Sequence, residues 1–396
     1  MLVGSSHDGV GHVHSHAAHL SMGPQQRRKV RLILAAIVVP LAVATLVGLV
    51  WLWPRGETPV GSVELNYSGS STAIGTVTSI GAMDEVGQYP VTMVVDGVEV
   101  PVHVPFEVVG NGLDVGDKIK ALFNPGAVEF GSPYIFVDFV RDVPLSALVA
   151  LYVIVVVAVA RWKGLAALLG LTASLAVVGT FMLPALMVGT APLAVIVVGA
   201  SAMMFASIYF AHGVSIRTTT AVLGTFAGLL ITGVLAAVSV RANNLTGTLS
   251  DDAISLAGQL TYLNMSDILL CGIILAGLGA LNDVTITQVS TVWELQAANA
   301  AASRAKVFSQ AMVIGRDHIA STVYTLAFAY VGTSLPLLMS AALVNRGVLD
   351  LFTVGQIAEE IVRTLVASIG LVLAIPMTTA IATLLAPIAP SRKADA

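Results

Sequence analysis

The sequence contains few charged residues. Only 11% of its 396 residues are Asp, Glu, Lys or Arg, whereas 56% are hydrophobic. A soluble domain carries about 25% charged residues, so a chain this poor in charge along most of its length cannot cover itself with a water-facing surface. The composition excludes an ordinary soluble protein. It predicts an α-helical polytopic membrane protein of the plasma membrane, with the lipid bilayer as its first partner.

Cysteine and the common catalytic motifs are nearly or fully missing. The single cysteine, Cys271, excludes an intrachain disulfide. There is no P-loop, no Gly-x-Ser-x-Gly and no His-Glu-x-x-His. Asp283 and Asp317 would be the aspartates of an intramembrane protease, but Asp317 is expected at the membrane edge, and a proton-sharing dyad needs both carboxyls in one buried site. We therefore expect no enzyme activity and no cofactor.

Basic residues are scarce between positions 54 and 142. This segment holds twelve acidic and four basic residues, a net charge of −8. Asp96-Gly97 between two runs rich in β-branched residues is a strong hairpin signal. The five such runs are 73–80, 91–95, 98–104, 118–123 and 134–140. They predict a small all-β barrel of the OB or SH3 type. Its acidic surface would repel phosphate, so we expect no nucleic-acid partner.

Long uncharged runs make up most of the remaining chain. About 20 helical residues cross the hydrocarbon core, which predicts about eight transmembrane helices. They are an anchor at 31–53 and spans near 143–160, 165–187, 191–211, 218–240, 268–290, 319–343 and 364–388. The predicted organisation is a cytoplasmic tail (1–30), the anchor (31–53), the β domain (54–142), a seven-helix domain (143–390) and a C-terminal tail (391–396).

The distribution of Lys and Arg predicts the orientation. With the N-terminus in the cytoplasm, twelve Lys and Arg residues fall inside and seven outside, and four of those seven lie in the β domain. Because cytoplasmic loops carry an excess of positive charge, we expect both termini to be cytoplasmic and residues 54–142 to be extracytoplasmic.

Histidines are concentrated in the N-terminal tail. Five of the eight lie within the first 30 residues, and His12, His14 and His16 alternate along the chain. Neutral imidazoles bind Zn and Ni well, although no cysteine or acidic residue completes a defined site. Two interpretations stay open: a divalent-metal site in the tail, or a disordered, solvated segment of low complexity.

The sixth predicted helix contains polar residues that a lipid-facing helix would not tolerate. Asp283 lies about 22 Å from the outer end of that helix at 1.5 Å per residue. Asp283, Thr287, Ser290 and Glu294 share one face, which is expected to meet another helix or a water-filled cavity. The next helix opens with Asp317 and His318. The candidate pathway residues are Asp283, Asn282, Thr287, Gln288, Ser290, Glu294, Asp317 and His318.

Two roles for Asp283 stay open. An ionisable residue inside the membrane is by default a functional candidate, which favours an ion or proton pathway. Alternatively, its carboxyl holds helices together by hydrogen bonds.

Three stretches carry a resemblance to a known family. They are Gly279–Val284 with the Ser- and Thr-rich run to Glu294, Gly315-Arg316-Asp317, and Glu360–Leu365. In these stretches, and in its order of anchor, β domain and seven spans over residues 30–390, the chain resembles the YibE/F family of multi-pass bacterial membrane proteins. The resemblance implies a membrane protein without an assigned activity. His318, where an aliphatic residue is expected, and the histidine-rich tail depart from the family pattern.

A weaker likeness runs to SecD/SecF and the RND permeases. These proteins place an acidic residue in an out-to-in helix before a cytoplasmic amphipathic helix, and Asp283 and the segment 294–306 occupy those places here. By analogy alone, the likeness implies proton coupling at Asp283.

Two functions therefore follow. The first is a transporter or proton-coupled export component that acts on a small solute or ion. The second is a membrane scaffold whose acidic outside domain binds an envelope protein. A homo-oligomer is compatible with either.

Overall fold

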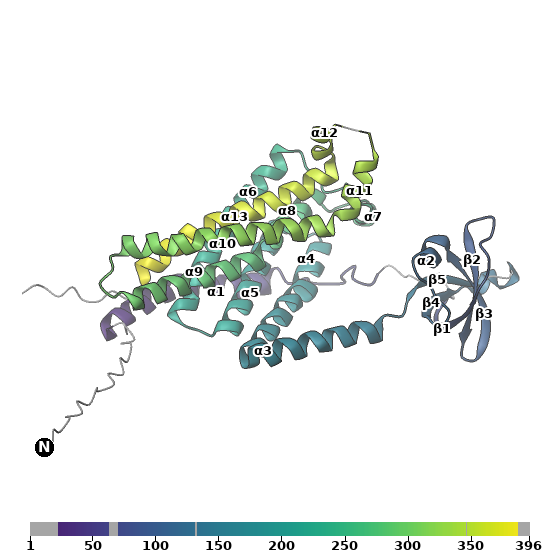
Figure 1. The fold of residues 1–396 in the computed structure, drawn as a ribbon, viewed down its shortest axis with the longest axis horizontal. Coiled ribbons are helices and arrows are strands. Elements are labelled where there is room, and N and C mark those ends of the chain that lie inside the picture. Colours follow the sequence, from purple (N-terminus) through teal and green to yellow (C-terminus); the bar gives the residue numbers. More distant parts are fainter. Residues whose placement is uncertain (1–22, 63–69, 131–132, 346, 387–396) are drawn as a thin grey trace, which may run out of the picture. The chain divides into compact units, whose positions relative to one another are not determined.

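A computed structural model describes residues 23–62, 70–130, 133–345 and 347–386 of the chain (Figure 1). The described chain is mostly helical, with several long apolar helices and one small barrel of five strands. It divides into two compact units. The first contains the described residues up to 55 and those from 169 onward, and the second contains those from 56 to 168.

The second unit contains the predicted all-β barrel. Its strands are β1 (Ser71–Ile80), β2 (Gln88–Val95), β3 (Val98–Pro105), β4 (Lys118–Phe123) and β5 (Tyr134–Phe139). They close in the order β1-β2-β3-β5-β4, with β3 and β5 parallel and the other pairs antiparallel. The prediction of a small all-β barrel is confirmed, and both expected types, OB and SH3, stay open.

Local sequence signals explain the barrel. Asp96 and Gly97 both have positive φ, 49° and 86°, as a two-residue hairpin turn requires. Alternate residues of the strands point inward and form one apolar core with Leu113. A short helix, α2 (Phe106–Gly110), and a 3₁₀ turn, η1 (Pro125–Phe130), complete the barrel.

Long helices form the rest of the described chain. They are α1 (Pro24–Trp51), α3 (Asp142–Val177), α5 (Pro192–His212), α6 (Ile216–Ala242), α8 (Met265–Ala276), α9 (Leu278–Ala298), α10 (Arg304–Thr333) and α13 (Gly355–Leu385). α3 continues through the π-helical turn η2 (Val178–Met182) into the short helix α4 (Leu183–Met187). Shorter helices are α7 (Asp251–Gln259), α11 (Leu335–Leu343) and α12 (Val348–Phe352). Six helical stretches are long and apolar enough to cross a membrane, or seven if α10 and α11, bent by 63°, count as one.

When α10 and α11 count as one span, the difference between seven stretches and the eight predicted spans lies at one residue. The runs near 143–160 and 165–187 form a single stretch, Asp142–Met187, of 46 residues. Arg161 interrupts it with non-helical angles, φ 53° and ψ −132°. This break coincides with the predicted cytoplasmic turn, so the number of crossings stays a prediction.

The seventh predicted helix begins earlier than expected. The alanine-rich stretch 295–306 was predicted to be helical throughout, but α9 ends at Ala298 and α10 begins at Arg304. Ser303 caps α10 by accepting a hydrogen bond from the Lys306 backbone N–H. Asp317 therefore lies well inside a 30-residue helix. The expectation that Asp317 sits where a helix begins was wrong, whereas its position relative to the membrane edge stays a prediction.

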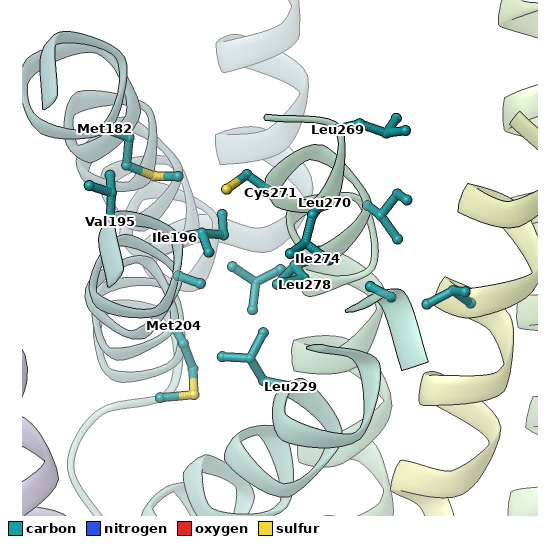
Figure 2. Close-up of a cluster of buried hydrophobic side chains, with 14 of the residues drawn as sticks. Met182, Val195, Ile196, Met204, Leu229, Leu269, Leu270, Cys271, Ile274 and Leu278 are labelled. Carbon is teal, nitrogen blue, oxygen red and sulfur yellow. The ribbon is translucent and has the colours of Figure 1, made fainter. Parts of the chain in front are cut away.

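Two sets of contacts hold the helical unit together. Side chains of α5 and α8, with Met182 of η2 and Leu229 of α6, converge in an apolar cluster that also buries Cys271 (Figure 2). Small residues let α6 approach α9 and α13: a Cβ at Gly228 would lie 2.7 Å from Leu281 Cδ2 and 3.0 Å from Ala374 Cβ. The close packing expected of small residues in membrane helices is present at this position.

Candidate functional site

Asp283 and His318 face each other across α9 and α10. Asp283 Oδ2 lies 3.9 Å from His318 Nε2. This distance is within ion-pair range but exceeds the 2.7–3.2 Å typical of a direct hydrogen bond. His318 Nε2 is buried, and among the described residues no atom serves as its hydrogen-bond partner. The structure thus brings together two of the candidate pathway residues, one from each helix.

The pair lies at the middle of the helical unit. Gly315, one turn from His318, is buried against α13: a Cβ there would lie 2.8 Å from Ile375 Cγ2. Ile375 is central in a run without Asp, Glu, Lys or Arg that extends from Thr364 to Ser391. Asp283 is 15 residues from the end of α9 and His318 is 14 residues from the start of α10, about 22 Å of helix in each case.

Asp283 is not buried within the chain. Its side chain is 73% exposed and that of His318 is 32% exposed. The spacing correctly placed Asp283, Thr287, Ser290 and Glu294 on one side of α9, but Asp283, Thr287 and Glu294 are exposed and Ser290 is only partly buried. The described helices of this chain therefore leave most of that face uncovered, because helical spacing does not indicate which element covers a shared face. Its contact with another helix or a water-filled cavity stays a prediction.

The other residues of that face have local partners. Ser290 Oγ donates to the Ile286 carbonyl of its own helix at 2.9 Å. Glu294 Oε1 accepts from Arg217 Nη1 of α6 at 2.9 Å. This pair is exposed on both sides, so its contribution to stability is small.

Asn282 and Gln288 point into the unit. Asn282 Nδ2 donates to Ser207 Oγ of α5 at 2.8 Å, whereas its buried Oδ1 accepts no hydrogen bond within the described chain. Gln288 Nε2 donates to the Ala311 carbonyl of α10 at 3.0 Å and to Thr379 Oγ1 of α13 at 2.8 Å. Asn282 adjoins the Asp283–His318 pair, while Gln288 joins three helices.

The sequence prediction missed a buried layer of threonines around Gln288. Thr225 of α6 and Thr285 of α9 lie hydroxyl to hydroxyl at 2.7 Å. Thr378 and Thr379 of α13 are fully buried, and Thr378 Oγ1 has no hydrogen-bond partner in the described part of the chain. The available signal was the Thr378-Thr379 dipeptide within an otherwise apolar run.

Asp317 does not join the pair. It is exposed on α10, as is its neighbour Arg316, and within the described ranges neither forms an ion pair or a side-chain hydrogen bond. The level of the Asp283–His318 pair, near the middle of the stretch Met265–Ala298 and of α10, therefore carries two carboxylates, one guanidinium and one imidazole.

Metal binding remains a sequence-based prediction. His12, His14 and His16 lie outside the described residues. Within the described residues, no three His, Cys, Asp or Glu side chains are grouped so that they could hold a metal ion.

Comparison with known proteins supports the resemblance inferred from the sequence. A family model described as YibE/F-like protein matches residues 148–388, more than half of the chain, and the match includes Asp283 and His318. The anchor and the barrel lie outside this match. No curated protein and no solved structure matches the chain. The chain belongs to the YibE/F-like family.

Proposed function

We propose that this chain is a plasma-membrane transport protein that couples proton movement to the export of a small solute or ion, with Asp283 and His318 as the proton-carrying residues. The observation that supports the proposal is the placement of a carboxylate and an imidazole 3.9 Å apart, with Asp283 near the middle of the helical stretch Met265–Ala298 and His318 near the middle of α10. Ionisable groups at such depth are costly and usually mark ion or proton pathways.

Charge balance supports proton binding at this level. Asp283, Asp317 and Arg316 sum to −1 when His318 is neutral. One bound proton, on His318 or on the Asp283 carboxyl, makes the level neutral. Because net charge in the hydrocarbon core is unfavourable, this arrangement favours the uptake of one proton per chain.

The gap between the two groups provides a means of control. At 3.9 Å the proton cannot pass directly between His318 Nε2 and Asp283 Oδ2. A rotation of either side chain, or one bridging water, would connect the two atoms. Histidine suits this role because one ring nitrogen of a neutral imidazole can accept a proton while the other donates one.

Proton flux in liposomes tests the proposal. The full-length chain is reconstituted into vesicles that contain a pH-sensitive dye, and a potassium diffusion potential drives protons inward. We expect the wild-type chain to acidify the lumen faster than empty vesicles, and Asp283→Asn to abolish the difference. Asp252→Asn, which alters an exposed acid on α7, is the control and should leave the flux unchanged. Equal flux in Asp283→Asn and wild type would contradict the proposal, as would wild-type flux no faster than in empty vesicles.

The scaffold function is the second candidate. It is supported by the net charge of −8 over residues 54–142, which is suited to a basic envelope partner. Under this function, Asp283→Asn keeps full activity in cells, while replacement of exposed barrel acids such as Glu99 and Glu107 by lysine removes it. The proton-transport function predicts the opposite pattern.

A further inference from the structure

α10 is a long helix that the chain's own residues leave largely uncovered. Only four of its 30 residues are buried: Val307, Ala311, Gly315 and Leu326. None of the ten residues from Arg316 to Thr325 is buried. Many of these ten are polar, although they follow directly on Gly315, which packs at the middle of the unit. A helix of this composition at this depth is poorly suited to lipid.

Four exposed side chains of α10, three of them polar, form a regular stripe. Asp317, Ser321, Tyr324 and Phe328 follow one another at i, i+4, i+7 and i+11, and all four are exposed. This spacing places them on one side of the helix. We call the polar face these four residues together with Asp283 and Thr287, which are exposed on the neighbouring helix α9.

The geometry points to a second copy of this chain as the occupant of the polar face, with the two copies related by a two-fold axis along the membrane normal. Hydrocarbon offers no hydrogen bonds and no counter-charge to Asp283, Asp317 and Arg316. A copy of the same face supplies both. Closed two-fold dimers are also the commonest form of homo-oligomer.

Two-fold symmetry pairs the charges in a specific way. Arg316 and His318 are two residues apart, which is about 200° around a helix with 3.6 residues per turn. His318 lies on the side of α10 that faces α9, since it meets Asp283. Arg316 therefore lies on the opposite flank, with Asp317 between them on the exposed side.

When the stripes of two parallel α10 helices meet about a two-fold axis, opposite flanks face each other. Arg316 of one copy then lies beside α9 of the second copy, on the side that presents Asp283. The dimer contains two such Arg316–Asp283 contacts, one on each side of the axis. The positive group that lacks a partner within the described chain thus meets the exposed negative group of the second copy.

Disulfide formation in native membranes tests the contact. In a Cys271→Ala background, Tyr324→Cys lies on the polar face at 63% exposure, 20 residues from the start of α10. Val234→Cys is the matched control, at 56% exposure and 18 residues from the start of α6. We expect oxidation to link Tyr324→Cys into a species of twice the mass of the chain and to leave Val234→Cys monomeric.

Three results would overturn the proposal. They are a monomeric Tyr324→Cys, equal linkage of the control, and a product whose mass is not twice that of the chain. The last would assign the polar face to a different protein.

Charge exchange tests the pairing. Two copies of the chain with different tags are co-expressed. One copy is purified by its tag, and the amount of the other copy that is recovered with it measures self-association. Arg316→Asp alone should lose self-association, because the new carboxylate faces Asp283 of the second copy. Asp283→Arg alone should also lose self-association, because the new guanidinium faces Arg316 of the second copy. When one copy carries Arg316→Asp and the other carries Asp283→Arg, both contacts again join opposite charges. The two copies should then be recovered together. Recovery no better in the mixture than in either single variant would contradict the pairing.

This inference does not depend on the proposed transport function. Cross-linking and recovery of tagged copies require no proton flux. A dimer without flux would refute proton transport alone, and flux from a chain that does not cross-link would refute the dimer alone.

Discussion

Replacement of two glycines of α6 by alanine should change the free energy of unfolding in opposite directions. At Gly228 an added Cβ would lie 2.7 Å from Leu281 Cδ2 and 3.0 Å from Ala374 Cβ. Non-bonded carbon atoms pack at about 3.5–4.0 Å. The Leu281 side chain can rotate away, but Ala374 Cβ is attached to the backbone of α13, so α13 itself must shift. At Gly233 the nearest atom, Ile274 Cδ1, would lie at 3.8 Å, an ordinary contact.

The expected magnitudes follow from two opposing effects. An extra methyl group in a closely packed interior costs about 1–3 kcal/mol. Replacement of glycine by alanine within a helix stabilises it by about 0.5–1 kcal/mol. Gly228→Ala should therefore lower the free energy of unfolding by about 1 kcal/mol, the difference between the middle values of the two effects. Gly233→Ala should raise it by about 0.5–1 kcal/mol. The difference between the variants isolates the cost of steric overlap.

Thermal unfolding in detergent measures both variants. The fraction of monodisperse protein that survives heating is followed by size-exclusion chromatography for the wild type, Gly228→Ala and Gly233→Ala. The midpoint should fall for Gly228→Ala and stay equal or rise for Gly233→Ala. Equal midpoints for the two variants would refute the argument that α6 and α13 meet at Gly228 without room for a methyl group.

Three further predictions concern other parts of the chain. Gln288→Leu removes two interhelical hydrogen bonds. At about 0.6 kcal/mol for each bond in a membrane protein, the free energy of unfolding should fall by about 1 kcal/mol, and the midpoint in the same heating assay should fall with it. A decrease no larger than that of Thr287→Val, on the exposed side of α9, would contradict this prediction. In a Cys271→Ala background, Glu99→Cys should react with an impermeant thiol reagent on intact cells and Ala301→Cys only after lysis, since the barrel is predicted outside and the segment between α9 and α10 inside; the reverse pattern would invert the orientation. Deletion of residues 1–22, which precede α1, should leave the midpoint unchanged and remove Ni²⁺ binding measured by calorimetry, whereas unchanged binding would reject the tail as a metal site.

Local signals in the sequence were sufficient to predict the barrel. The five predicted runs each overlap one strand, and the largest difference at a strand start is at β2, which begins at Gln88 rather than position 91. The Asp96-Gly97 turn sets the pairing of β2 with β3 because its geometry depends only on adjacent residues. The strand order around the barrel depends on distant pairs and was not predictable beyond the two types.

Distant contacts limited the prediction of the site. Helical spacing identified the side chains that share a face of α9, but it could not show that Asp283 is exposed while Gln288 reaches Thr379, 91 residues away. The position of Asp317 was missed because helix formation by alanine favours one continuous helix over 295–306, whereas the Ser303 cap starts a new one. The family was predictable because its motifs are local.

The central claim is that Asp283 and His318 act as one proton-carrying unit, and a double-mutant cycle on proton flux tests it most directly. Flux is measured in the liposome assay for wild type, Asp283→Asn, His318→Gln and the double variant. Residues that act as a unit show non-additive losses. We therefore expect each single variant to fall to the same residual flux and the double variant to fall no further. Wild-type flux in either single variant, or a double variant whose loss is the product of the two single losses, would contradict the claim.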